Sequence, residues 1–144
     1  MIKYETQWDE ESGLATAQVI DTTLGEVFVG TAFCSEEDQD MKSRLTGQEI
    51  ALRRAFIEHI KYLKRLYSVK YNTLKNFKKQ IEGCKHYNSE FQIEMILERE
   101  LKELGEQVAH LRCKLEVEKS HLREYIRAKA EIYQKIREGR KAKN

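Results

Sequence analysis

The sequence predicts an α+β fold: a small N-terminal three-stranded antiparallel sheet, then a long antiparallel helical hairpin that makes the protein oligomeric through its helices. Three observations predict it. Residues 2–33 alternate apolar and polar side chains, the 144 residues include no proline and only 7 glycines, and apolar residues after position 47 recur at steps of four and three. This length suits a single domain, 1–144, divided into an acidic β-meander and loop (1–46) and a helical hairpin (47–144).

The pattern predicts strands near 2–8, 14–20 and 26–33. The turns between them end in Gly13 and Gly25, and glycine tolerates the positive φ that closes a short hairpin loop. Alternation predicts one face of this sheet to pack against helix. The apolar side chains at the alternating positions are those of Ile2, Tyr4, Trp8, Val27, Val29 and Phe33. Small residues would let strand, loop and helix approach closely, at Gly30, Ala32, Gly47, Ala51 and Ala55.

A first helix is expected over about 48–82, with Thr46 as N-cap, Glu49 completing a capping box, and Gly83 ending the helix. Its apolar stripe consists of Leu52, Phe56, Ile60, Leu63, Tyr67, Leu74, Phe77 and Ile81.

Asn88 or Ser89 can cap a second helix that runs to about 138. Its stripe consists of Leu97, Leu101, Leu104, Val108, Leu111, Leu115, Leu122, Ile126 and Ile136. If the helices fold back on each other, residue 82 faces about 89, and Gly105 lies near Leu66 and Tyr67. The end of the second helix then overhangs, and its apolar side chains, Ile132 and Tyr133 among them, predict at least a dimer.

Charge divides the chain unevenly. Residues 1–46 carry 3 basic and 10 acidic side chains, a balance of −7, whereas 47–144 carry 23 and 14, a balance of +9. Because 47–88 is the most basic stretch, an anionic ligand is expected to meet this part of the chain.

Two adjacent arginines, Arg53 and Arg54, are the first candidates for such a ligand. In one interpretation, Arg54 fixes the acidic loop by hydrogen bonds to Asp38 or Asp40. In the other, one of the two arginines faces outward and holds a phosphate.

The turn between the helices provides the other candidates, Tyr87, Asn88 and Phe91, because an exposed tip has little structural need for aromatic side chains. Phe91 could instead serve as a hydrophobic staple. The predicted ligand-binding set is therefore Arg53, Arg54, Tyr87, Asn88 and Phe91.

Other classes of function lack their motifs. The four histidines form no i, i+4 pair, and no nucleophile elbow, phosphate-binding glycine loop or H-E-x-x-H occurs, so we expect no metal, no cofactor and no enzymatic activity. Three widely spaced cysteines, with no signal sequence and no long apolar run, predict a cytoplasmic protein without a membrane partner.

One stretch resembles a known group. Small phage and prophage proteins of Gram-positive bacteria share a strand ending in G-x-A-x-C, an acidic loop, and G-x-x-I-A-x-x-R-A opening a helix. The matching residues here are Gly30, Ala32, Cys34, Asp38, Asp40, Gly47, Ile50, Ala51, Arg54 and Ala55. With the short sheet and long helices, the chain resembles the Thoeris anti-defence phage proteins of the first described type.

That resemblance implies a sponge in the host cell cytosol. Such proteins sequester cyclic ADP-ribose isomers, and some also hold cyclic oligonucleotides, in an oligomer built through the helices. The first hypothesis is thus a phage protein that binds a cyclic nucleotide signal without cleaving it. The alternative is a coiled-coil structural or protein-interaction module of a phage, with no small-molecule ligand. Nucleic acid is not an expected partner, since the acidic sheet argues against a large footprint.

Overall fold

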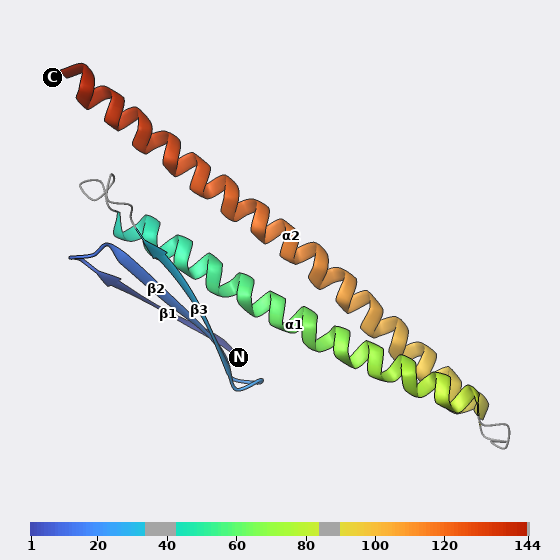
Figure 1. Ribbon diagram of the computed structural model, residues 1–144. Coiled ribbons are helices and arrows are strands. Elements are labelled where there is room, and N and C mark those ends of the chain that lie inside the picture. Colours follow the sequence, from blue (N-terminus) through green and yellow to red (C-terminus); the bar gives the residue numbers. More distant parts are fainter. Residues whose placement is uncertain (34–42, 84–89, 144) are drawn as a thin grey trace. The chain divides into compact units, whose positions relative to one another are not determined.

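The secondary-structure elements follow the predicted order, with a sheet before two long helices. The structure, a computed structural model, describes residues 1–33, 43–83 and 90–143 (Figure 1). Helix α1 spans Arg44–Glu82 and helix α2 spans Glu90–Lys143. The absence of proline from the whole sequence permits helices of this length, since proline would remove a backbone hydrogen bond and kink them.

Three strands, β1 (Ile2–Asp9), β2 (Leu14–Asp21) and β3 (Glu26–Phe33), form an antiparallel meander in the order β1-β2-β3. Both turns close through glycine, with φ of 71° at Gly13 and 68° at Gly25. Glycine reaches this left-handed region without the steric cost that a Cβ imposes. The predicted strands and turns are therefore confirmed.

The described chain forms two compact units, and each takes part of both helices. The first, called the sheet unit, comprises residues 1–59 and 116–144; the second, called the helical unit, comprises residues 60–115. Both boundaries between these units fall inside helices.

In the sheet unit, α1 packs on β3 at backbone distance. A Cβ built on Gly30 would lie 2.1 Å from the carbonyl oxygen of Ala51 and 2.5 Å from the amide nitrogen of Ala55. Gly47 leaves similar room, since a Cβ there would lie 2.9 Å from the ring of Trp8. The close approach predicted from small residues is confirmed.

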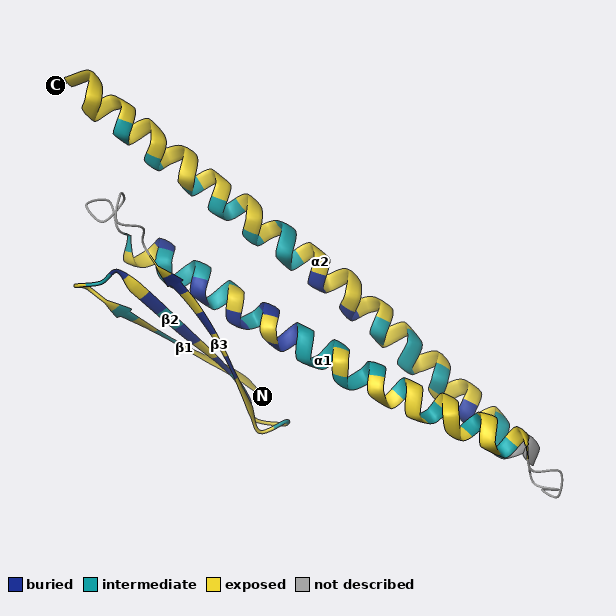
Figure 2. Ribbon diagram, viewed as in Figure 1, coloured by how far each residue is buried: buried dark blue, intermediate teal, exposed yellow. Residues whose placement is uncertain are grey.

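This packing corrects the predicted face of β3. Val27, Val29 and Phe33 are 51%, 49% and 64% exposed, and the buried positions of that strand are Phe28, Gly30 and Ala32 (Figure 2). The contact with α1 leaves no room for branched side chains, so the strand turns its small residues inward. Beside them on the same face of the sheet lie the fully buried side chains of Ala15, Ala17 and Val19 from β2, and opposite them lie Ala51 and Ala55 of α1.

The start of α1 also differs from its prediction. Ser43, rather than Thr46, caps the helix: its Oγ accepts a hydrogen bond from the Thr46 amide at 3.3 Å, and its carbonyl accepts one from the Gly47 amide at 2.9 Å. Serine at this position satisfies an amide that the helix cannot. The helix therefore begins one turn earlier than predicted, and Thr46 lies in its first turn. The end at Glu82, before Gly83, is as predicted.

In the helical unit, the halves of α1 and α2 run antiparallel, but in a different register from the predicted one. Tyr71 lies opposite Gly105, where a Cβ would meet its ring at 3.5 Å, and Lys78 Nζ lies 3.4 Å from Glu98 Oε1. The register is therefore shifted by about one turn from the predicted one, with Tyr71 rather than Leu66 and Tyr67 beside Gly105. Within this unit, the buried apolar residues are Ile60, Leu97, Leu111 and Leu115.

Two predicted stripe positions are exposed instead. Phe77 is 50% exposed, and Lys78 takes the inward position, with its side chain only 24% exposed. A lysine can pack its aliphatic stem while its ammonium group pairs with an acid, which here is Glu98. Ile136, in the sheet unit, is 41% exposed, and α2 extends to Lys143 rather than to about 138.

Candidate functional site

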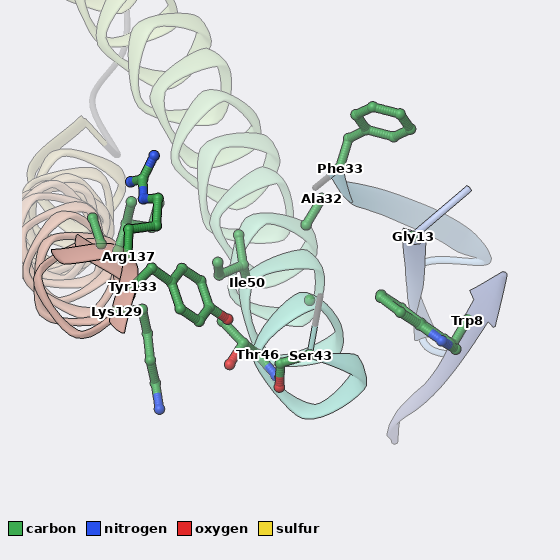
Figure 3. Close-up of a pocket in the computed structure, with 13 residues that line it drawn as sticks. Trp8, Gly13, Ala32, Phe33, Ser43, Thr46, Ile50, Lys129, Tyr133 and Arg137 are labelled. Carbon is green, nitrogen blue, oxygen red and sulfur yellow. The ribbon is translucent and has the colours of Figure 1, made fainter. Parts of the chain in front are cut away.

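A hollow of about 250 Å³ lies in the sheet unit, beside the start of α1 (Figure 3). Three structural parts line it. The sheet and its first turn contribute Trp8, Gly13, Ala32 and Phe33; the start of α1 contributes Ser43, Thr46, Gly47 and Ile50; and α2 contributes Ile126, Lys129, Ala130, Tyr133 and Arg137. It is slightly smaller than most drug-sized ligand pockets, which measure roughly 300 Å³ or more.

The charged side chains that line the hollow, Lys129 and Arg137, both come from α2. Lys129, Tyr133 and Arg137 follow one another at four-residue steps and therefore share a helix face. Lys129 Nζ also lies 5.5 Å from the centre of the Tyr125 ring, a cation–π distance. Two of the described residues that line the hollow are cations, Lys129 and Arg137, and Arg137 also has an interaction partner within the protein.

The hollow also has two aromatic side chains, Trp8 and Tyr133. Figure 3 shows Tyr133 reaching toward Thr46, with Trp8 on the sheet, whereas the ring of Phe33 points away and is 64% exposed. The Trp8 indole Nε1 donates a hydrogen bond to Glu10 Oε2 at 2.7 Å, which holds the ring in place. Rings of this kind offer stacking surfaces for a planar group such as a nucleobase.

The first turn of α1 contributes a buried hydroxyl group. Thr46 is only 9% exposed and lines the hollow, and its Oγ1 makes no hydrogen bond to any other residue that the structure describes. Buried polar groups are nearly always paired, and an unpaired one destabilises the fold. The hydroxyl is thus available to a bound molecule.

The two predicted arginines, Arg53 and Arg54, both contact other groups of the sheet unit. Arg53 Nε donates to Glu49 Oε1 at 2.8 Å, and its guanidinium lies 5.3 Å from the centre of the Tyr125 ring. Arg54, which is exposed, donates from one terminal nitrogen to the Thr31 carbonyl oxygen at 2.7 Å. Neither lines the hollow, and Arg54 joins α1 to the edge strand β3.

The remaining predicted site residues belong elsewhere. Tyr87 and Asn88 lie outside the described residues, as do the alternative cap Ser89 and the proposed Arg54 partners Asp38 and Asp40. Phe91 belongs to the first turn of α2, in the helical unit. The predicted set of five residues therefore stays a prediction, and the hollow is lined by other side chains.

A signal for the missed residues is present in the sequence. The series Ile126, Lys129, Tyr133 and Arg137 repeats at helical spacing and mixes apolar, aromatic and basic side chains. The sequence pattern instead predicts Tyr133 as part of an apolar overhang of the second helix. The residues of the sheet that line the same hollow are more than 90 residues away in sequence and gave no local signal.

A buried ion pair lies elsewhere in the sheet unit. His59 Nε2 is 2.9 Å from Asp21 Oδ2, and both residues are under 10% exposed. Asp21 Oδ1 accepts hydrogen bonds from the amides of Thr23 and Leu24 at 3.0 and 3.1 Å. The hydrogen bond with His59, helped by these amides and opposed by burial, lowers the pKa of Asp21 below its ordinary value. The pair fixes the second turn of the sheet to α1.

The described residues include no group of three or more histidine, cysteine or acidic side chains that could hold a metal ion. None of their helices is long and apolar enough to cross a membrane. Comparison with protein-family models, with curated proteins and with solved structures found no match.

Proposed function

We propose that the protein binds a cyclic nucleotide signal in the hollow of the sheet unit and sequesters it without converting it. One observation carries this proposal: the hollow combines aromatic side chains with Lys129 and Arg137, and none of its described lining residues is acidic. Aromatic faces stack on bases, and cations hold phosphates by charge-assisted hydrogen bonds. Cyclic ADP-ribose isomers, which carry both groups, are the first candidates, with cyclic oligonucleotides second.

The resemblance to Thoeris anti-defence phage proteins supports the same proposal. It adds that the protein acts in the host cytosol as an oligomer and performs no catalysis. Ile132 and Ile136, in the α2 part of the sheet unit, are 48% and 41% exposed, which is consistent with burial against a second copy. The predicted ligand contacts at Tyr87, Asn88 and Phe91 stay a prediction.

A thermal-shift titration followed by calorimetry tests the proposal. A ligand at 100 times its dissociation constant adds about 2.7 kcal/mol to the stability of the folded form. For a chain of this size, that raises Tm by about 5–10 °C. We expect such a shift with cyclic ADP-ribose, and we expect the nucleotide to be recovered chemically intact after heat denaturation. Altered nucleotide would contradict sequestration.

The site is tested by a matched pair of double variants. K129Q with R137Q removes both cations of the hollow, whereas K102Q with R112Q removes the same charge from exposed positions on the same helix. Only the first pair should weaken binding, by ten-fold or more, since hydrogen bonds to charged groups contribute about 1.5–3 kcal/mol each. Equal effects of the two pairs would mean that overall charge, not the hollow, attracts the nucleotide.

A structural or interaction module is the second candidate, and the outer face of the sheet favours it. That face exposes Leu14, Val27, Val29 and Phe33, and apolar patches of this kind mark protein interfaces. In this case no nucleotide shifts Tm, and mutation of Val29 and Phe33 to threonine or serine changes the assembly state in sedimentation.

A further inference from the structure

We infer that the first turn of α1 is the seat for a phosphate group of the bound nucleotide, with the Thr46 hydroxyl as a donor. This inference rests on the proposed function, because it assigns a place within the same hollow. It names the part of the ligand that this end of the hollow recognises: a phosphate ester or diester attached to a planar base.

The hydroxyl of Thr46 gives the first reason. It is nine-tenths buried, it lines the hollow, and no other described residue pairs with it. Valine has nearly the same shape and would avoid the unfavourable burial of an unpaired hydroxyl. A phosphate oxygen in the hollow would accept this hydrogen bond and remove that penalty.

The backbone of the same turn gives the second reason. Ser43 pairs with the amide of Thr46, but among the described residues no acceptor joins the amides of Arg44 and Leu45. Unpaired amides at a helix start carry partial positive charge and bind anions. The first turn of α1 contains no acidic side chain that would occupy this position.

The opposite wall gives the third reason. Lys129 and Arg137 on α2 supply full positive charges to the hollow, and Tyr133 stands between them in sequence, with its ring next to Thr46 in Figure 3. The start of α1 and the Thr46 hydroxyl therefore line the same hollow as two cationic side chains and the rings of Trp8 and Tyr133.

Substitution of Thr46 by valine tests the assignment. T46V keeps the side-chain shape and removes only the donor; T73V makes the same change at an exposed position of α1 and serves as the control. Calorimetry would compare four probes with each protein: cyclic ADP-ribose, ADP-ribose, adenosine and inorganic pyrophosphate. Circular dichroism would confirm that both variants keep the helical content of the wild type.

We expect T46V to weaken binding of the phosphate-bearing probes by ten-fold or more and to leave adenosine and the T73V control unchanged. In addition, T46V without ligand should be at least as thermally stable as the wild type, because it loses an unpaired buried hydroxyl. Unchanged affinity of cyclic ADP-ribose for T46V, or equal losses for adenosine, would overturn the phosphate seat while leaving the proposed function standing.

The reverse outcome is also distinguishable. Pyrophosphate binding that T46V abolishes, with no binding of any nucleotide, would support the anion seat and overturn the proposed function. K129Q provides a second variant at the opposite wall, and it should weaken the same phosphate-bearing probes. If none of the four probes binds the wild type, both proposals fail.

Discussion

Substitution of Gly30 by alanine would force α1 away from the sheet. The added Cβ would lie 2.1 Å from the Ala51 carbonyl oxygen and 2.5 Å from the Ala55 amide nitrogen, against an ordinary contact of 3.4 Å or more. Both obstacles are backbone atoms of one helix and cannot rotate aside. The helix must move by more than an ångström, which also loosens the packing of the buried alanines around it.

The expected loss is about 3 kcal/mol, the upper part of the range for overpacked cores. With a urea dependence of about 2 kcal/mol per M, the unfolding midpoint falls by about 1.5 M. Trp8, the only tryptophan of the chain, belongs to the sheet unit, so its fluorescence reports this unit specifically. Urea titrations of the wild type and G30A, followed by that signal, measure the loss.

Gly139 provides the matched control. A Cβ there meets nothing within 4 Å, and alanine favours helix by about 0.8–1 kcal/mol over glycine, so G139A should be neutral or slightly stabilising. If G30A destabilised the sheet unit by less than about 0.5 kcal/mol, below the range for overpacking, the backbone contact between β3 and α1 would be refuted.

Three further predictions concern packing and pH. V19A should lower the free energy of unfolding by about 2 kcal/mol in urea titrations, and V29A should lower it by less than about 1 kcal/mol, because only Val19 is fully buried. Equal losses would mean that the face of the sheet that carries Val29 is also packed. G105A should be neutral or raise Tm, since its Cβ meets Tyr71 at an ordinary 3.5 Å; a large loss would contradict the register. Because the pKa of Asp21 in the folded protein lies below its ordinary value of 3.8, its contribution to stability is present above pH 3.8 and is lost as pH falls through the folded pKa. D21N should lack this acid-dependent loss in urea midpoints measured from pH 2 to 6.

Local features of the fold were predictable from the sequence. Gly13 and Gly25 predicted the turns, because only their left-handed backbone closes these loops at low cost. The absence of proline predicted the long helices. The small size of Gly30, Ala51 and Ala55 predicted the close approach of helix and strand, although these residues meet only in the folded chain.

Features that depend on tertiary contact were not predictable in the same way. The alternating pattern of β3 does not say which of its two faces packs against α1, and the branched Val27 and Val29 suggested the wrong face. The backbone contact between Gly30 and α1 determines which face is buried. The helix register likewise could not be obtained from the spacing of the apolar residues, and it places Tyr71 beside Gly105.

The candidate site was the least predictable part. Arg53 and Arg54 were identified by charge, but other groups engage them. Glu49 lies one turn before Arg53 on the same helix, whereas Tyr125 and the Thr31 carbonyl belong to distant segments that no local pattern identifies. The hollow instead collects residues from the sheet, the start of α1 and the last third of α2. Such a site arises only when the chain folds.

The most direct test of nucleotide binding in the hollow is an NMR titration of the isotope-labelled protein with cyclic ADP-ribose, since its ligand-shifted amides locate the contact. The account predicts saturable shifts at residues 43–50 and 126–137, which line the hollow, with Lys102 and Arg112 unaffected. Absence of any shift, or shifts confined to the turn around Tyr87 and Asn88, would contradict it.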